Sequence, residues 1–200
     1  MRVLGITGGI ATGKSTVTQM FVDLGAASES ADAIARNLLA PGTPETAAVA
    51  AQFPDCVDKP HVAIDRQRLA ARIFSDPDAR KQLEAILHPP IVAELQRRIA
   101  SYRALPAPSI AVIEIPLLFE AGLTSIVDAI VVAASPVELQ VPRLMERTGI
   151  TEEEARRQIA SQWPIEQKIA AATHVVRTDV PVEETREIVG QVWRTEVDRN

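Results

Sequence analysis

Short apolar runs alternate along this chain with longer stretches whose apolar residues recur at helical spacing. The runs Val3–Ile6, Ile110–Ile115 and Ala129–Ala134 are apolar without alternation, as strands covered on both faces are. A shorter run, His174–Arg177, predicts one further strand. Because long helical stretches separate these strands, we expect an α/β fold with a parallel sheet flanked by helices on both faces.

The helical spacing begins soon after the first strand. Lys14–Leu24 has its apolar residues on one side, and Gly25 ends the pattern. Residues 43–105 are mostly helical in pattern, and the prolines of Leu87–Pro90 predict a kink or a boundary. Further helices are expected at Asp32–Ala40, Val137–Arg147, Thr151–Ala172 and Val182–Val197.

The length and composition fit one domain that buries a core. The chain has 200 residues, of which 46% are hydrophobic. We expect a sheet core, a helical insertion and a helical lid in this domain. The core would comprise about residues 1–30, 108–136 and 172–200, the insertion about residues 31–107, and the lid about residues 137–171.

Net charge and cysteine content limit the binding partners and the cell compartment that we expect for this protein. A net charge of -5 argues against a nucleic-acid partner held by bulk charge. The single cysteine, Cys56, allows no intramolecular disulfide and favours a reducing compartment. We see no signal-peptide pattern, and the apolar run Ile126–Ala134 is short and contains Asp128, so no membrane span is expected. We expect a cytoplasmic monomer or weak homo-oligomer.

The first strand leads into a segment that fits the phosphate-binding loop pattern Gly-x-x-x-x-Gly-Lys-Ser in full. Its glycines let backbone N–H groups turn toward an anion, and the following helix points its positive end at the same place. Lys14 is expected to reach the β and γ phosphates of ATP, and Ser15 to ligate Mg²⁺. The expected nucleotide-binding residues are Gly8, Gly9, Ala11, Thr12, Gly13, Lys14, Ser15 and Thr16.

A phosphate-binding loop does not identify the acceptor of the phosphate. The chain lacks the Asn-Lys-x-Asp pattern of GTPases and the His-Arg-Asp and Asp-Phe-Gly patterns of protein kinases. A small-molecule kinase also needs a carboxylate near the acceptor hydroxyl and arginines that close over the phosphates. Asp32 is the candidate carboxylate, because the chain should return there to the carboxyl edge of the sheet. The alternative is that Asp32 or Ser30 only caps the next helix.

Four arginines are candidates for a lid that closes over the phosphates. Arg143 and Arg147 lie four residues apart on one predicted helix, and Arg156 and Arg157 follow on the next. Glutamates are interleaved with these arginines, which leaves open that they form a solvated charged face.

Two further ionisable residues have open interpretations. His88 precedes two prolines, and a lone histidine is more often structural than catalytic. Glu114 is an isolated charge in an apolar strand. Two interpretations stay open for Glu114: a place near Mg²⁺ at the end of the strand, or an ion pair with a basic side chain.

Together, these residues resemble the dephospho-CoA kinase family nearly end to end. "GITGGIATGKSTV" is similar to the opening of the family, and "ARIFSDPDARKQLEAILHP" to its helical segment with a His-Pro. "IPLLFEAGL" resembles the family's Pro-Leu-Leu block, and "SPVELQVPRLMERTGITEEEARRQIASQWP" its lid. The resemblance implies a P-loop kinase with a core, a helical acceptor-binding domain and a lid. It also implies a reaction in which ATP, with Mg²⁺, phosphorylates the ribose 3′-hydroxyl of dephospho-CoA to give CoA and ADP.

The resemblance also implies roles for individual residues. Asp32 would activate or orient the acceptor hydroxyl, and Arg147 would close from the lid. Lys14 and Ser15 would hold phosphate and metal. The acceptor side would be lined by His88, Pro116, Leu117 and Glu120.

The chain departs from the family pattern at three places. Ser30 stands where the family usually has the first residue of Asp-x-Asp, and the preceding "AASES" is more polar than the strand expected there. Arg177-Thr178 stand where the family often has Asp-Asn beside the adenine. Two alternatives therefore stay open: a P-loop kinase of another nucleoside or nucleotide, and a non-catalytic nucleotide- or CoA-binding relative.

Overall fold

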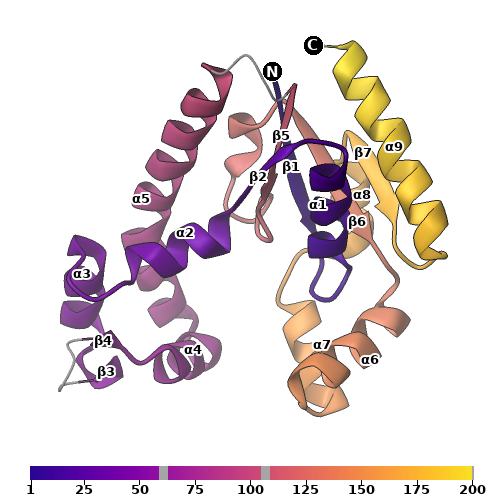
Figure 1. Cartoon of the computed structure of the whole chain (residues 1–200). Helices are drawn as coiled ribbons and strands as arrows, with labels where there is room; N and C mark the ends of the chain where they lie inside the picture. The colour runs from indigo at the N-terminus through magenta and orange to yellow at the C-terminus, as the bar shows by residue number, and fades with distance from the viewer. Residues whose placement is uncertain (59–62, 105–108, 200) are drawn as a thin grey trace. The chain divides into compact units, whose positions relative to one another are not determined.

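The computed structural model describes residues 1–58, 63–104 and 109–199 (Figure 1). The chain divides into two compact units, one formed by Met1–Ser30 with Ile99–Asn200 and the other by Ala31–Arg98. We describe each unit by itself. The expected junction between insertion and core at residues 107 and 108 lies outside the described residues.

The first unit contains a five-stranded parallel sheet in the order β2-β5-β1-β6-β7. The central strand β1 runs between β5 and β6, with Ile6 opposite Glu114 on one side and Val131 on the other. The predicted parallel α/β fold is therefore confirmed. The strands are β1 (Arg2–Gly8), β2 (Ala27–Ser30), β5 (Ile110–Glu114), β6 (Ala129–Ala134) and β7 (His174–Arg177).

Strand β2 explains the polar segment that the apolar pattern did not predict as a strand. It lies at one edge of the sheet and pairs with β5 alone, so its side chains need not be apolar on both faces. Its register sets Ser30 opposite Glu114. The last residues of β2 and β5 therefore meet at the carboxyl edge of the sheet, next to the end of β1.

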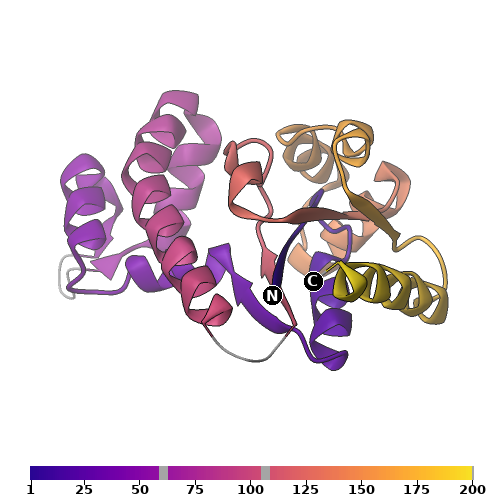
Figure 2. The same ribbon diagram turned by 90° about the horizontal axis from the view of Figure 1, so that it is seen from above.

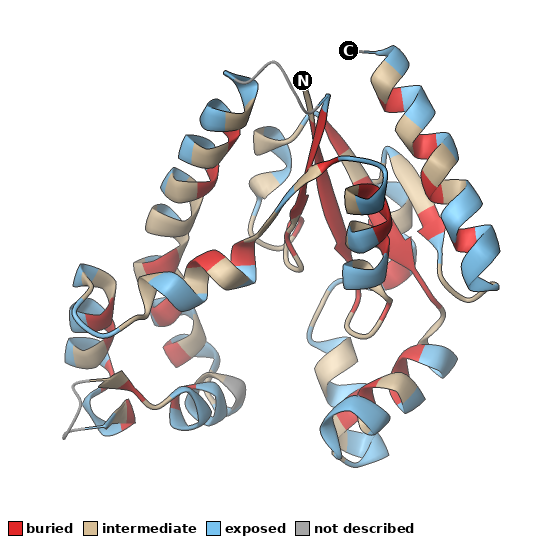
Figure 3. Cartoon of the chain, viewed as in Figure 1, coloured by how far each residue is buried: buried red, intermediate tan, exposed pale blue. Residues whose placement is uncertain are grey.

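Helices cover both faces of the sheet, and the alternation along β6 decides which face each residue contributes to. Val131 and Ala133 belong to a buried cluster with residues of α1 (Lys14–Asp23) and α9 (Val182–Asp198), which lie side by side (Figure 2). Val132 and Ala134 face the opposite way, toward Ile165 of α8 (Ile165–Ala170). The three central strands β5, β1 and β6 are accordingly the most continuously buried part of the unit (Figure 3). Leu24, predicted on the apolar side of α1, is instead 44% exposed beyond its last residue.

The predicted lid, about residues 137–171, contains α6 (Val137–Thr148), α7 (Glu152–Ala160) and α8, and α6 packs on α7 through a small apolar cluster. The expected helix start at Thr151 is confirmed by a capping box with Glu154. The prediction of one helix over Thr151–Ala172 is wrong, because the chain leaves helical conformation between Ala160 and Ile165. Pro164 cannot continue the hydrogen-bonding pattern of α7, and it caps α8 instead.

The second unit is largely helical, as its pattern predicts. At Leu87–Pro90 a kink or a boundary is predicted, and the boundary is wrong, because the 27-residue helix α5 continues through both prolines. The sequence pattern also missed a two-stranded antiparallel hairpin, β3 with β4. The elements that begin in the second unit are α2 (Ala31–Leu38), α3 (Pro44–Gln52), η1 (Pro54–Cys56), β3 (Val57–Asp58), β4 (Ala63–Ile64), α4 (Arg66–Ser75) and α5 (Pro77–Arg103).

One short 3₁₀ helix, η2 (Leu123–Ile126), completes the first unit between β5 and β6. Over the described ranges, we find no helix with the length and apolar character needed to cross a bilayer.

Candidate active site

The phosphate-binding loop follows the central strand and closes tightly against the neighbouring strand. At Gly8 the backbone has φ of 152°, and a Cβ there would lie 2.4 Å from the carbonyl oxygen of Ala133. No residue other than glycine fits that position without moving the backbone. Gly13 has φ of 80° and precedes the first residue of α1, so it turns the chain from loop to helix. Ala11 is the non-glycine residue with positive φ, at 57°, in the described chain.

Two side chains of the loop donate hydrogen bonds to the same backbone oxygen. Lys14 Nζ lies 2.7 Å from the carbonyl oxygen of Gly9. The buried hydroxyl of Thr12 donates to this oxygen at 3.0 Å. Ser15 and Thr16 follow in the first turn of α1, and both are exposed. The arrangement holds the lysine across the loop, with the amino end of α1 directly beside it.

Glu114 lies against the hydroxyl groups of α1. Ser15 Oγ donates to Glu114 Oε1 at 3.2 Å, and Thr18 Oγ1 donates to Glu114 Oε2 at 3.3 Å. A charge at the end of an otherwise apolar strand was the sequence signal for this position. Hydroxyl and carboxylate oxygens are the protein ligands that a small hard cation prefers.

The chemistry of this donor set fits Mg²⁺. Within the ranges that the structure describes, no group of three or more His, Cys, Asp or Glu side chains could hold a metal ion. Mg²⁺ does not require such a cage, because it usually takes one or two protein oxygens together with substrate phosphates and water. Ser15 and Glu114 provide that kind of partial site.

A cavity of about 370 Å³ adjoins the loop on the side of β7. Arg143 Nη2 donates to the carbonyl oxygen of Thr178 at 2.8 Å, and the Thr178 hydroxyl donates to the carbonyl oxygen of Thr12 at 2.8 Å. Thr178, one of the departures from the family pattern, therefore ties the β7 loop to the phosphate-binding loop. The cavity is lined by Ala11, Gly13, Thr16, Met20, Arg143, Thr178, Val180, Val182 and Thr185.

The other residue of that departure is engaged in an ion pair. The Arg177 guanidinium donates to Asp179 at 2.7 Å through Nε, and this hydrogen bond lowers the pKa of Asp179 below its ordinary value. The guanidinium is half exposed. Arg177 therefore faces its neighbour in the loop, while Thr178 makes the contacts to the site.

The structure separates the four candidate lid arginines into engaged and available groups. Arg143 is held by Thr178, and Arg156 pairs with Glu152 at 2.8 Å. Arg147, in the last turn of α6, and Arg157, on α7, are exposed and have no ion-pair partner among the residues described. Family position singles out Arg147, and its catalytic role stays a prediction.

The turn that follows β5 contains the residues expected on the acceptor side. Thr7 Oγ1 donates to the carbonyl oxygen of Pro116 at 3.1 Å. Glu120 Oε1 accepts from Lys168 Nζ at 2.8 Å and from the backbone N–H of Trp163 at 3.0 Å. The expectation that Glu120 contacts substrate stays a prediction. Lys168 was not predicted from the sequence, because a single lysine in a charged helical stretch gives no signal.

The remaining two predicted residues belong to the second unit. Asp32 lies in the first turn of α2, where it is exposed and its carboxylate makes no hydrogen bond or ion pair within the described chain. His88 lies inside α5 and is partly buried. The cap interpretation of Asp32 therefore finds no support in its contacts.

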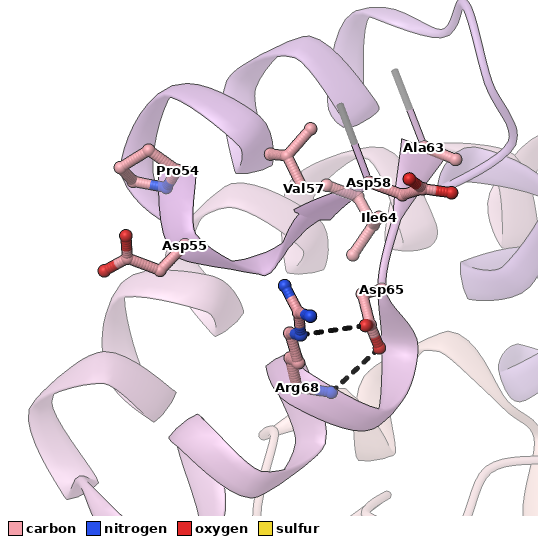
Figure 4. A pocket seen from close by; sticks show the side chains of 8 residues that line it. All are labelled: Pro54, Asp55, Val57, Asp58, Ala63, Ile64, Asp65 and Arg68. Carbon is pink, nitrogen blue, oxygen red and sulfur yellow. Dashed lines mark hydrogen bonds and ion pairs between the residues drawn. The ribbon is translucent and has the colours of Figure 1, made fainter. Parts of the chain in front are cut away.

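The second unit also contains a cavity of about 590 Å³ beside its small hairpin (Figure 4). Asp65 caps α4 there by accepting from the N–H groups of Gln67 and Arg68. The Arg68 side chain turns back to the same carboxylate at 3.1 Å. No predicted site residue is among the residues that line this cavity in the described chain.

Comparison with known proteins agrees with this geometry. The family model described as dephospho-CoA kinase matches residues 2–184. A dephospho-CoA kinase of Syntrophotalea carbinolica is 45% identical over 189 residues, which cover 94% of this chain and 89% of that protein. One of Geobacter metallireducens is 40% identical over 200 residues, which cover 100% and 99% respectively.

A solved structure supports the same conclusion. The dephospho-CoA kinase from Campylobacter jejuni has a TM-score of 0.70 and 29% identity, covering 99% of this chain and 98% of that chain. The loop, the sheet order and the relatives agree, and the chain therefore belongs to the dephospho-CoA kinase family.

Proposed function

We propose that this chain transfers the γ-phosphate of ATP to the ribose 3′-hydroxyl of dephospho-CoA, giving CoA and ADP. One observation carries the proposal within a chain of this family: Ser15 of the phosphate-binding loop hydrogen-bonds Glu114 at 3.2 Å, at the carboxyl edge of the two central strands. Ligands of open α/β sheets bind at that edge, where the strand order reverses. The loop, its lysine and the oxygen donors lie together at that edge, which supports a triphosphate site there.

On the donor side, the backbone N–H groups of the loop and Lys14 would cradle the β and γ phosphates. Ser15 and Glu114 would hold Mg²⁺. Bound there, the ion would neutralise charge on the phosphate oxygens. The cavity beside Arg143 and Thr178 is the proposed place of the nucleotide base.

On the acceptor side, Asp32 would orient or deprotonate the attacking hydroxyl, because its carboxylate is exposed and unengaged. Arg147 would reach the transferring phosphate from the lid, and closure would exclude water as a competing acceptor. His88, Pro116 and Leu117 would contact dephospho-CoA. We further propose that the protein acts in the cytoplasm as a monomer or weak homo-oligomer, without a nucleic-acid or membrane partner.

A coupled ADP-release assay tests this function. The chain would be supplied with ATP and Mg²⁺ and with dephospho-CoA, adenosine, AMP or no acceptor. ADP release with dephospho-CoA alone, accompanied by CoA, is the expected result. Release with adenosine or AMP instead would indicate a kinase of another nucleoside or nucleotide. ATP binding without release to any acceptor would indicate a non-catalytic relative, with Ser30 as the first position to revert to aspartate.

A further inference from the structure

Lys168 is an unusual lysine because its side chain is completely buried. It lies on α8, the short last helix of the predicted lid. An ammonium group loses its hydration when it is buried, so it must find strong acceptors inside the protein. The acceptors that it finds are the basis of this inference.

The Lys168 ammonium connects three parts of the proposed site. Nζ lies 2.8 Å from Glu120 Oε1 and 3.4 Å from the carbonyl oxygens of both Gly8 and Pro116. Gly8 is the first glycine of the phosphate-binding loop, and Pro116 begins the turn expected to line the acceptor side. A lysine ammonium has three N–H donors, and these three oxygens match them in number.

Neighbouring contacts attach the same turn to the segment between α7 and α8. The Trp163 backbone N–H donates to Glu120 Oε1 at 3.0 Å. The rings of Trp163 and Phe119 stack with centroids 5.7 Å apart and planes 8° apart. Thr7 adds a second donor to the Pro116 carbonyl at 3.1 Å. The end of the lid, the phosphate loop and the turn after β5 therefore meet at Lys168 and Glu120.

The pair is poorly explained by stability alone. The desolvation of the fully buried Lys168 ammonium and of Glu120, whose side chain is 14% exposed, offsets much of their attraction, so apolar side chains of similar volume often stabilise a fold as well. Moreover, Glu120 Oε2 is buried and has no hydrogen-bond partner in the described chain. What the pair does provide is a fixed separation between the loop backbone and the turn backbone.

We propose that Lys168 and Glu120 are a positioning pair for phosphoryl transfer. Lys168 holds the Gly8 end of the phosphate-binding loop at a set distance from the Pro116 segment. Glu120 in turn anchors Lys168 and the backbone of Trp163, at the end of the lid. Neither residue needs to touch a substrate. Transfer requires the attacking oxygen, phosphorus and leaving oxygen in line, so a small shift between these backbones slows the reaction. This inference rests on the proposed function.

The test compares Lys168→Met and Glu120→Gln with a matched control, Glu196→Gln. Glu196 is also fully buried and ion-paired in this unit, but it lies among residues at the amino edge of the sheet. For each variant we would measure the thermal midpoint, the Kd for ATP, and kcat and KM with dephospho-CoA. The wild-type chain is assayed first, so that failure of the proposed function is recognised separately.

Lys168→Met should lower kcat by about 10- to 100-fold, with Kd for ATP changed by less than about threefold. Glu120→Gln keeps the size of the side chain and the acceptor for Trp163, and should lower kcat by a smaller factor. Glu196→Gln should lower the thermal midpoint with kcat unchanged. If Lys168→Met does not fold, Glu120→Gln and Lys168→Arg decide the matter in the same way.

The positioning role is overturned if the folded variants keep kcat within about twofold of wild type while their thermal midpoints fall. A stability role alone would give that result, because it affects the folded fraction and not the turnover of folded molecules. A wild-type chain that does not phosphorylate dephospho-CoA would overturn the proposed function and, with it, this role.

Discussion

The parallel strands of the central sheet have an ionic cluster at their amino ends, the amino edge, and another at their carboxyl ends, the carboxyl edge. The two clusters are built differently. At the amino edge, Glu196 of α9 accepts from Arg2 of β1 at 2.9 Å and lies 2.7 Å from His174 Nε2 of β7. At the carboxyl edge, Lys168 bonds Glu120 and two backbone carbonyls. Both clusters place one fully buried charge beside a less buried partner.

The difference lies in what each cluster holds together. At the amino edge, side chains bond side chains, both oxygens of Glu196 are engaged, and the contacts join two strand starts to the last helix. At the carboxyl edge, a side chain bonds the backbone of Gly8, where β1 ends and the phosphate-binding loop begins, and of Pro116 in the turn after β5. One carboxylate oxygen there has no partner among the residues described. The comparison teaches that the amino edge secures the fold, whereas the carboxyl edge secures loops whose positions matter for chemistry.

The largest effect is expected from Lys14→Ala at the carboxyl edge. Turnover should fall by about 10³-fold, because the variant loses a charge directed at the transferring phosphate. The thermal midpoint should change little, since the lysine is not buried. Steady-state kinetics with dephospho-CoA and a thermal melt check both parts. Turnover close to that of wild type would contradict the role of the loop.

The next effect is expected from Asp32→Asn, which tests the acceptor side. Turnover should fall by about 10²-fold, because an amide cannot accept the hydroxyl proton. The Kd for ATP should be largely kept, since the substitution leaves the loop intact. Kinetics and equilibrium binding would be measured on the same preparation. Normal turnover would remove Asp32 from its assigned role.

A smaller effect is expected from Glu114→Gln, which weakens the proposed metal site without removing side-chain volume. The Mg²⁺ concentration that gives half-maximal turnover should rise by about tenfold, because the amide carries no charge. Thr18→Ala is the matched control, since it removes the other hydroxyl bonded to Glu114. An unchanged Mg²⁺ dependence in Glu114→Gln would show that this carboxylate does not serve the metal.

Much of this architecture was predictable because it depends on local patterns. The apolar runs predicted β1, β5, β6 and β7, and the glycine spacing predicted the loop whose Gly8 excludes any Cβ. Strand β2 was missed because an edge strand needs no continuous apolar pattern. The helix through Pro89 and Pro90 was missed because local propensity is overridden there by the length of packed helix on either side.

The site was predictable only in part, for a related reason. Ser15 could be assigned from a contiguous motif, whereas Glu114 and Lys168 act through partners 99 and 160 residues away in the chain. No local spacing reports such pairs. The residues of the phosphate-binding loop are contiguous in the sequence, whereas the contacts that position this loop come from distant segments that the fold brings together.

The smallest effect on turnover is expected from Glu196→Gln, which tests the amino edge. Burial on its own would raise the pKa of Glu196, but hydrogen bonds from His174 and Arg2 outweigh it, so the pKa lies below the ordinary value of 4.5. A carboxylate with a lowered folded pKa stabilises the protein above its unfolded pKa, and this stabilisation is lost as pH falls through the folded value. At neutral pH the substitution should therefore cost about 2 kcal/mol of unfolding free energy with kcat unchanged.

The pH dependence of this variant separates a charge effect from a packing effect. Thermal midpoints of wild type and Glu196→Gln would be compared at neutral pH and well below pH 4.5, the ordinary pKa of the group. The gap between them should shrink in acid, because wild type then protonates Glu196 and loses the interaction that the variant already lacks. A gap that stays constant would mean that packing, and not the charge, holds the amino edge. A fall in kcat at neutral pH would mean that the two edges are coupled, because a change at the amino edge would then reach the loops at the other end of the same strands.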